Sequence, residues 1–129
     1  MNCNVDIETA LYRLLVASGY HASAHTIPAR LERNLPHVHV VRTGGYVSDR
    51  VVDHNSIDFD VYANTQALAM ATALELTGWV RELVGEIIGT QCYESEVSTS
   101  PYHNPDPRHP TIGRATLKAQ ITIRTQEVN

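Results

Sequence analysis

The stretch Ile57-Asp58-Phe59-Asp60-Val61-Tyr62-Ala63-Asn64-Thr65 decides the fold of this chain. Its apolar residues fall at every second position, which is the period of a strand with one buried face. The period then becomes that of a helix with one apolar stripe, made of Ala69, Ala73, Leu76, Val80, Leu83, Val84 and Ile87. Asn64 or Thr65 stands at this change, where a side-chain oxygen caps free N–H groups. The sequence therefore predicts a strand that runs into a long helix, at about 65–85, which buries its stripe on a sheet.

The segments on both sides of this unit repeat the same two periods. Helical spacing of apolar residues predicts a first helix at about 5–17, ended by Ser18-Gly19. Alternation predicts strands at about 37–43, 51–63, 91–99 and 115–124. The first two of these strands form an antiparallel hairpin around Gly44-Gly45. The order α-β-β-α-β-β predicts an α+β fold: a mainly antiparallel four-stranded sheet with two main helices packed on one face.

The composition fits one globular domain, residues 1–129. A hydrophobic content of 43% and a charged content of 19% are ordinary for a globular protein and argue against disorder. The net charge is −4 and Lys118 is the only lysine, so the chain lacks the clustered positive charge that a nucleic-acid surface requires.

The cysteines and the apolar runs indicate where the chain is made. Cys3 and Cys92 have no CxxC spacing and are interpreted as free thiols. No basic, apolar leader and no run of about 18–20 apolar residues is present, so we expect neither a signal peptide nor a membrane span. The sequence predicts a protein that is made in a cytoplasm and stays there or in an assembly built there.

Histidines and aspartates on the predicted hairpin admit two catalytic interpretations. His37 and His39 are two residues apart and share a strand face, as metal-ligand pairs do, and His54 or Asp58 is placed to complete such a site. Asp58 and Asp60 also share a face and are candidates for acid–base work. The simpler interpretation is that these side chains are solvated, or paired across the sheet. No HExxH motif, nucleophile motif or phosphate-binding loop is present, so we predict no catalytic residue, metal or cofactor.

Two long segments of mixed charge, at about 43–56 and 100–114, are interpreted either as solvated connections or as surfaces for another subunit. The second contains four prolines between residues 101 and 110, which exclude a helix. The residues that we predict for a subunit or partner interface are Arg42, Asp49, Arg50, Asp53, Arg108 and Arg114.

Three runs of the sequence carry a resemblance to a known family. They are LPHVHVVRTGG at residues 35–45, DFDVYANTQALAMATALELTGWVREL at 58–83 and SPYHNPDPRHPTIGRATLKAQITIRT at 100–125. Together they resemble the tail terminator (tail completion) proteins of long-tailed phages. The chain is most similar to those of phages that infect actinobacteria, and more distantly to the tail-completion group of phages lambda and SPP1. The resemblance covers about residues 35–126 and lies in element order and composition.

The resemblance implies a structural virion protein without catalysis or cofactor. Such a subunit is an α+β protein that forms a hexameric ring with copies of itself. The ring caps the tail tube, stops its polymerisation and joins the tail to the head, so the implied partners are the tail tube protein and a head-completion or connector protein. We keep three alternatives: a head–tail connector or neck protein of the same architecture, a small metal-dependent or acid–base enzyme that uses His37, His39, Asp58 and Asp60, and a cytoplasmic adaptor domain unrelated to phages.

Overall fold

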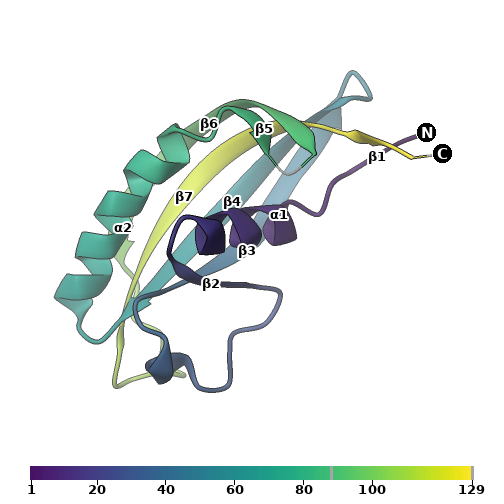
Figure 1. Cartoon of the computed structure of the whole chain (residues 1–129). Coiled ribbons are helices and arrows are strands. Elements are labelled where there is room, and N and C mark those ends of the chain that lie inside the picture. Colours follow the sequence, from purple (N-terminus) through teal and green to yellow (C-terminus); the bar gives the residue numbers. More distant parts are fainter. Residues whose placement is uncertain (88, 129) are drawn as a thin grey trace.

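The fold is built on one strongly curled sheet with two helices, as a computed structural model of the chain shows (Figure 1). The structure describes residues 1–87 and 89–128. The strands are β1 (Asn2–Cys3), β2 (His21–Ala24), β3 (His37–Ser48), β4 (Val52–Ala63), β5 (Gly85–Ile87), β6 (Thr90–His103), β7 (Gly113–Arg124) and β8 (Gln126–Glu127). The helices are α1 (Ile7–Ala17), α2 (Gln66–Arg81) and a 3-10 turn, η1 (Leu31–Arg33).

Strand β4 lies in the middle of the sheet, as the alternation in residues 57–63 predicts. Ile57, Phe59 and Val61 are fully buried and point toward the helices. The strand pairs over its length with β3 on one side and with β7 on the other, both antiparallel. Ala115, Leu117, Ala119, Ile121 and Ile123 of β7 bury the same face, so the alternation in this strand also predicted its buried side.

The prediction of a four-stranded antiparallel α+β fold is wrong. The chain is mostly β, with 48% strand and 24% helix. The main sheet has six strands in the order β2-β3-β4-β7-β6-β5, and β2 runs parallel to β3. A separate two-stranded sheet joins β1 to β8. The missed strands β1, β2, β5 and β8 are only two to four residues long, which is too short for an alternation of apolar residues to show.

Both helices bury apolar side chains in the single core that β4 and β7 line. Asp6 caps α1 by accepting from the backbone N–H of Thr9, and Thr65 caps α2 by accepting from that of Leu68. Helix α1 packs on β2 and β3, whereas α2 packs on β4, β6 and β7. From the predicted stripe, Ala69, Ala73, Leu76 and Val80 are buried and Val84 is exposed; the side chain of Ile87 lies outside the described residues.

Helix α2 approaches the start of β7 so closely that only glycine fits at position 113. A Cβ on Gly113 would lie 2.5 Å from the backbone nitrogen of Gln66. The Gln66 side chain accepts from the backbone N–H of Arg114 at 2.9 Å and donates to the carbonyl of the same residue. This contact fixes where β7 begins relative to α2.

The segment 43–56, interpreted from its sequence as a solvated connection or a subunit surface, belongs almost entirely to the long hairpin β3–β4. A bulge between Arg42 and Gly44 bends β3, and Gly45 has a φ of +146° with its Cα against the carbonyl of His54. We call residues 43–56 the arm; its tip is the turn between Ser48 and Val52. The second predicted loop is shorter than expected because β6 continues to His103. Pro101 is tolerated there because it lies in the register shift between Thr99 and Tyr102, where the ladder with β7 is interrupted.

No helix in the described part of the chain has the length and apolar character needed to cross a membrane.

Candidate functional site

The sheet has one face toward the helices and one face without a helix, which we call the open face. Side chains of β4 and β7 that stand opposite each other on the open face form polar pairs, namely Asp60–Thr116, Asp58–Lys118, Ser56–Gln120 and His54–Thr122. The Lys118 ammonium lies 3.0 Å from Asp58, and this hydrogen bond raises the lysine pKa. The open face is therefore a ladder of cross-strand pairs.

The ladder bears on the acid–base interpretation of Asp58 and Asp60. The Asp58 carboxylate is held by Lys118 through both of its oxygens, at 3.0 Å each. Asp60 accepts from the Thr116 hydroxyl at 2.7 Å. Each carboxylate thus has its own partner on β7, which is the cross-strand pairing expected of the simpler interpretation.

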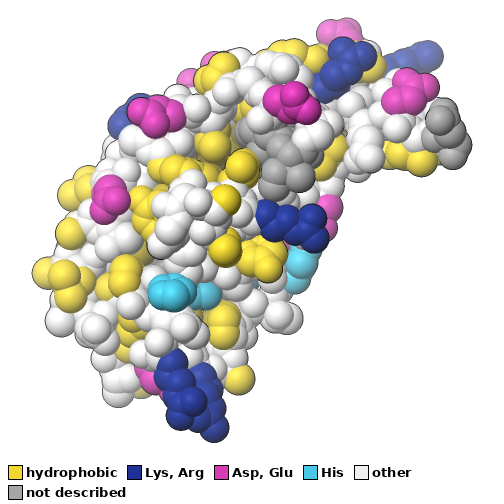
Figure 2. Space-filling model, in the orientation of Figure 1, with side chains coloured by type: hydrophobic (Ala, Val, Ile, Leu, Met, Phe, Trp, Pro, Cys, Tyr) yellow, Lys and Arg dark blue, Asp and Glu magenta, His cyan; other side chains and the backbone are white. Residues whose placement is uncertain are grey.

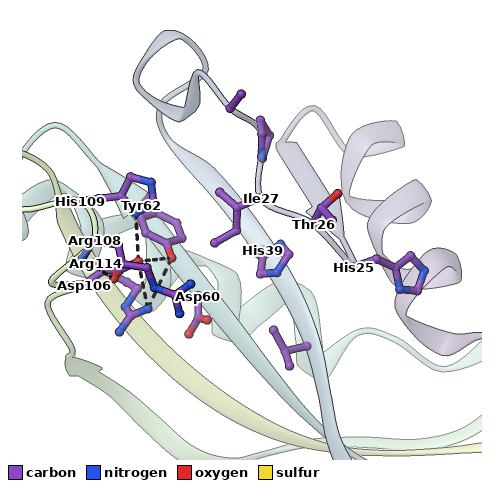
Figure 3. Close-up of a pocket in the computed structure, with 13 residues that line it drawn as sticks. His25, Thr26, Ile27, His39, Asp60, Tyr62, Asp106, Arg108, His109 and Arg114 are labelled. Carbon is purple, nitrogen blue, oxygen red and sulfur yellow. Dashed lines mark hydrogen bonds and ion pairs between the residues drawn. The ribbon is translucent and has the colours of Figure 1, made fainter.

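A buried carboxylate, Asp106, anchors the loop 104–112 over the end of β4 (Figure 3). Its Oδ2 accepts from the Tyr62 hydroxyl at 3.0 Å and lies 3.1 Å from Nδ1 of His109, while Oδ1 accepts from the backbone N–H of Arg108. Burial raises the pKa of Asp106, but these hydrogen bonds and the charge of Arg114 outweigh burial and bring it to about 2. Asp106 is therefore ionised at neutral pH.

Arg114, the second residue of β7, completes this cluster. Its guanidinium lies 3.5 Å from Asp106 and donates to the Tyr62 hydroxyl at 3.4 Å and to the carbonyl of Asn104 at 2.5 Å. The side chain is only 17% exposed. Arg114 therefore ties the loop to the sheet within one chain.

His37 and His39 share a single serine hydroxyl. Ser23 Oγ lies 2.8 Å from Nε2 of His37 and 2.7 Å from Nδ1 of His39. Burial lowers the pKa of both histidines, that of His37 to about 4. A hydroxyl has one proton, so one imidazole donates and the other accepts, and both rings are neutral at pH 7.

The residues of the metal hypothesis are not brought together. Ser23 occupies one ring nitrogen of each of His37 and His39. His54 lies on the arm, stacked on Tyr46 with the ring centroids 4.5 Å apart, and Asp58 is bound by Lys118. Within residues 1–87 and 89–128, no group of three or more His, Cys, Asp or Glu side chains is arranged to hold a metal ion.

A pocket of about 580 Å³ opens on the open face at the Tyr62 end of β4 (Figure 3). Residues 25–29 form one wall and Arg108, His109 and Arg114 form the other. His39, Asp60 and Tyr62 contribute to the lining between the walls. Sequence reasoning identified the charged loop but missed residues 25–29 and Tyr62, because no motif in these segments indicates that they meet.

The six residues predicted for an interface separate into two groups. Asp49 and Arg50 are exposed at the tip of the arm, and Arg108 is exposed at the pocket. The other three make contacts within the chain. Arg42 donates to Asn55 at 2.6 Å and lies 4.0 Å from Asp53, whose carboxylate is buried. Asp49, Arg50 and Arg108 are thus the members left free to contact another molecule.

Exposed apolar side chains mark two further surfaces. Tyr46 and Val47 are 65% and 38% exposed on the arm. On the outer side of α2, Leu68 and Leu74 are each about half exposed, and Figure 2 shows hydrophobic side chains along this helix. These are single exposed side chains on two elements, and only a contiguous apolar patch would by itself indicate a contact surface.

Comparison with known proteins adds no family. No family model matches the chain, and no curated protein matches it. The resemblance to tail terminators stays a prediction from the sequence.

Proposed function

We propose that this protein is a ring-forming structural subunit of a long-tailed phage, the tail terminator. The ring of copies caps the tail tube, stops its polymerisation and joins the tail to the head. Under this proposal the protein is not an enzyme and needs no cofactor. It is assembled in the host cytoplasm and resides at the head-proximal end of the virion tail.

The observation that carries the proposal is a pair of unlike strand edges on opposite sides of the main sheet. Strand β2 covers β3 only at residues 37–40, so residues 41–48 have no strand neighbour on that side in the described structure. Likewise, β5 covers β6 only at residues 90–92, which leaves 93–103 without an outer partner strand among residues 1–87 and 89–128. Open edges are templates for pairing with another chain.

Because the two edges differ, pairing one with the other joins copies head to tail. Such contacts close into a ring when the rotation between copies permits it. This is the symmetry that a tube-capping ring requires, whereas a two-fold dimer would pair like with like.

The edges also carry features that prevent indiscriminate pairing. Strand β6 has three register shifts between Cys92 and Tyr102, with Pro101 and the charged Glu94 and Glu96 along it. On β3, Glu8 accepts from the backbone N–H of Arg42 at 2.7 Å. Bulges, proline and charge blunt an edge against aggregation. They suit a subunit that stays separate until it meets the correct partner.

Light scattering on the purified protein, at low and high concentration and with or without tail tube protein, tests the proposal. We expect a closed species of several copies, formed at high concentration or on addition of tube protein. A single-copy species indifferent to tube protein would contradict the terminator function. A stoichiometric metal in the same sample would instead favour the enzyme alternative.

A head–tail connector or neck protein of the same architecture is the second candidate, because the unlike edges suit any ring in the tail-joining region. The partner separates the two functions. A terminator ring binds tube protein, whereas a connector ring binds the head-completion protein and ignores the tube.

A further inference from the structure

We propose that the tip of the arm of one copy docks into the pocket of the next copy, with Asp49 and Arg50 facing Arg108 and Asp60. This inference rests on the proposed ring and adds a second contact between neighbouring copies, beside the pairing of the unlike edges. The occupant of the pocket is thus a second copy of this chain.

The arm and the pocket lie at opposite ends of one strand. Val52 of β4 adjoins the tip, and Tyr62 of the same strand lines the pocket. At about 3.3 Å per residue these positions are roughly 33 Å apart. A copy therefore cannot fill its own pocket, and docking joins an arm to the pocket of another copy. The contact is head to tail, as in a closed ring.

The tip has charged side chains where the backbone favours glycine. Asp49 and Arg50 have φ values of +51° and +64°. Hairpin turns with two positive φ values prefer Asn-Gly or Asp-Gly, because an arginine there brings its Cβ close to the backbone. Within the described chain, neither side chain makes an ion pair or hydrogen bond that would offset this strain. Strain without a local benefit indicates a role in binding.

The pocket contains one cationic and one anionic side chain that are available to bind another molecule. The guanidinium of Arg108 has no ion-pair partner among the described residues; only its backbone N–H is used, on Asp106. Asp60 holds Thr116 through Oδ1, and Oδ2 has no hydrogen-bond partner in the described structure. Arg108 and Asp60 line the same pocket (Figure 3). One cation and one anion complement the Asp49-Arg50 pair at the tip.

The apolar parts also match. Ile27, Pro28 and Val41 line the pocket beside the charged groups. Tyr46 and Val47 are exposed on the arm just before the tip. Burial of these side chains against one another would add a hydrophobic contribution to the charge pairing.

Two single variants and their mixture test the docking. Arg50→Gly removes the charge from the tip and suits its positive φ, while Asp60→Asn removes the charge from the pocket and keeps an oxygen for Thr116. Under the conditions in which the wild type forms rings, we expect each variant to need at least about tenfold more protein to assemble. Arg13→Gln on the exposed side of α1 and Asp58→Asn on the open face are the matched controls, and we expect both to assemble as the wild type does.

The mixture gives a result that a general loss of stability would not. An Arg50→Gly copy keeps its pocket and an Asp60→Asn copy keeps its arm, so the two make one productive contact. We expect a one-to-one complex in the mixture, measured by light scattering, that does not grow to a ring. Thermal melts should show both variants folded, with Arg50→Gly melting no lower than the wild type.

The outcomes separate this inference from the ring itself. If the wild type forms rings and both variants form them equally well, the docking is wrong and the ring proposal stands. If the wild type stays a single copy with and without tube protein, both are overturned. A variant mixture that gives single copies only, while the wild type forms rings, would also contradict the docking.

Discussion

The two ends of β4 differ in how their polar side chains are used. At the Tyr62 end, Asp106, His109 and Arg114 satisfy one another inside the chain and fix a loop over the strand. At the Val52 end, the tip has positive φ values and exposes its charges. One strand thus joins a loop fixed by internal bonding to a tip whose Asp49 and Arg50 side chains have no hydrogen bond or ion pair among the described residues. We therefore expect mutations in the bonded cluster of Asp106, His109 and Arg114 to change stability, and mutations at the tip to change assembly.

The largest change in the free energy of unfolding is expected from Gly113→Ala, at the pocket end of β4. The added Cβ would lie 2.5 Å from the Gln66 backbone, and neither backbone can move without opening the joint between α2 and β7. We expect a loss of about 3 kcal/mol or more in the free energy of unfolding, measured with urea. Gly78→Ala is the control. No atom lies within 4 Å of its Cβ, so it should gain about 0.5–1 kcal/mol, as alanine does in helices. Equal stability of Gly113→Ala and the wild type would show that the close approach is absent.

The next largest effect is a dependence of the free energy of unfolding on pH, which arises from His37. Its pKa is lowered from 6.5 to about 4 in the folded protein, mainly by burial, so the unfolded chain binds more protons between these values. Stability is then fully present above about pH 6.5 and falls as the pH is lowered to about 4, by at most about 3 kcal/mol at 1.36 kcal/mol per pKa unit. Urea unfolding at several pH values measures this slope.

The variant His37→Gln tests the assignment of that slope. Its free energy of unfolding should be lower at pH 7 and should fall less steeply than that of the wild type between pH 6.5 and 4, because only His39, whose pKa burial also lowers, still titrates there. The low pKa of Asp106 adds a loss only below its ordinary value of 3.8. A variant that kept the full slope would assign it to another group.

Tyr62→Phe should lower the free energy of unfolding by less than Gly113→Ala does, and by less than the titration of His37 does. The Tyr62 hydroxyl is buried and donates to Asp106, so its removal deprives a buried carboxylate of one of its donors. We expect a loss of about 1–2 kcal/mol in unfolding free energy. Tyr46→Phe on the exposed arm is the matched change and should lie within about 0.5 kcal/mol of the wild type. Equal losses in the two variants would erase the contrast between the ends of β4.

The smallest change in stability is expected from Arg50→Gly at the tip, and it has the opposite sign. Glycine adopts φ +64° without the Cβ clash of arginine, so the melting temperature should rise by an amount that corresponds to about 1 kcal/mol or less. A lowered melting temperature would mean that Arg50 makes a stabilising contact within the chain.

Some elements could be predicted from sequence because their burial is one-sided. The alternation of Ile57, Phe59 and Val61 matches β4, and the spacing of Ala69, Ala73, Leu76 and Val80 matches the buried stripe of α2. The same reasoning failed for β2, whose residues His21–Ala24 have no strong strand preference and are ordered by parallel pairing with β3. The predicted number of strands in the main sheet was too small because the short strands β2 and β5 were not predicted.

The candidate site could be predicted only in part. The charged loops pointed to Asp49, Arg50 and Arg108, which the structure leaves exposed. Asp53 looked equivalent in the sequence but is buried beside Arg42, because it stands on the core side of β4 in the arm. A charge run does not reveal which strand face it occupies once a bulge shifts the register of the neighbouring strand.

By itself, the sequence determined the position of β4 and β7 and the buried stripe of α2, because a buried face imposes its period on neighbouring residues. Only the tertiary structure decided the six-stranded order, the two unlike open edges and the pocket. These depend on pairing between segments such as 25–29, 60–62 and 106–114, which are far apart along the chain. This pairing decides which polar side chains find hydrogen-bond partners, and the spacing of residues along the sequence does not reveal it.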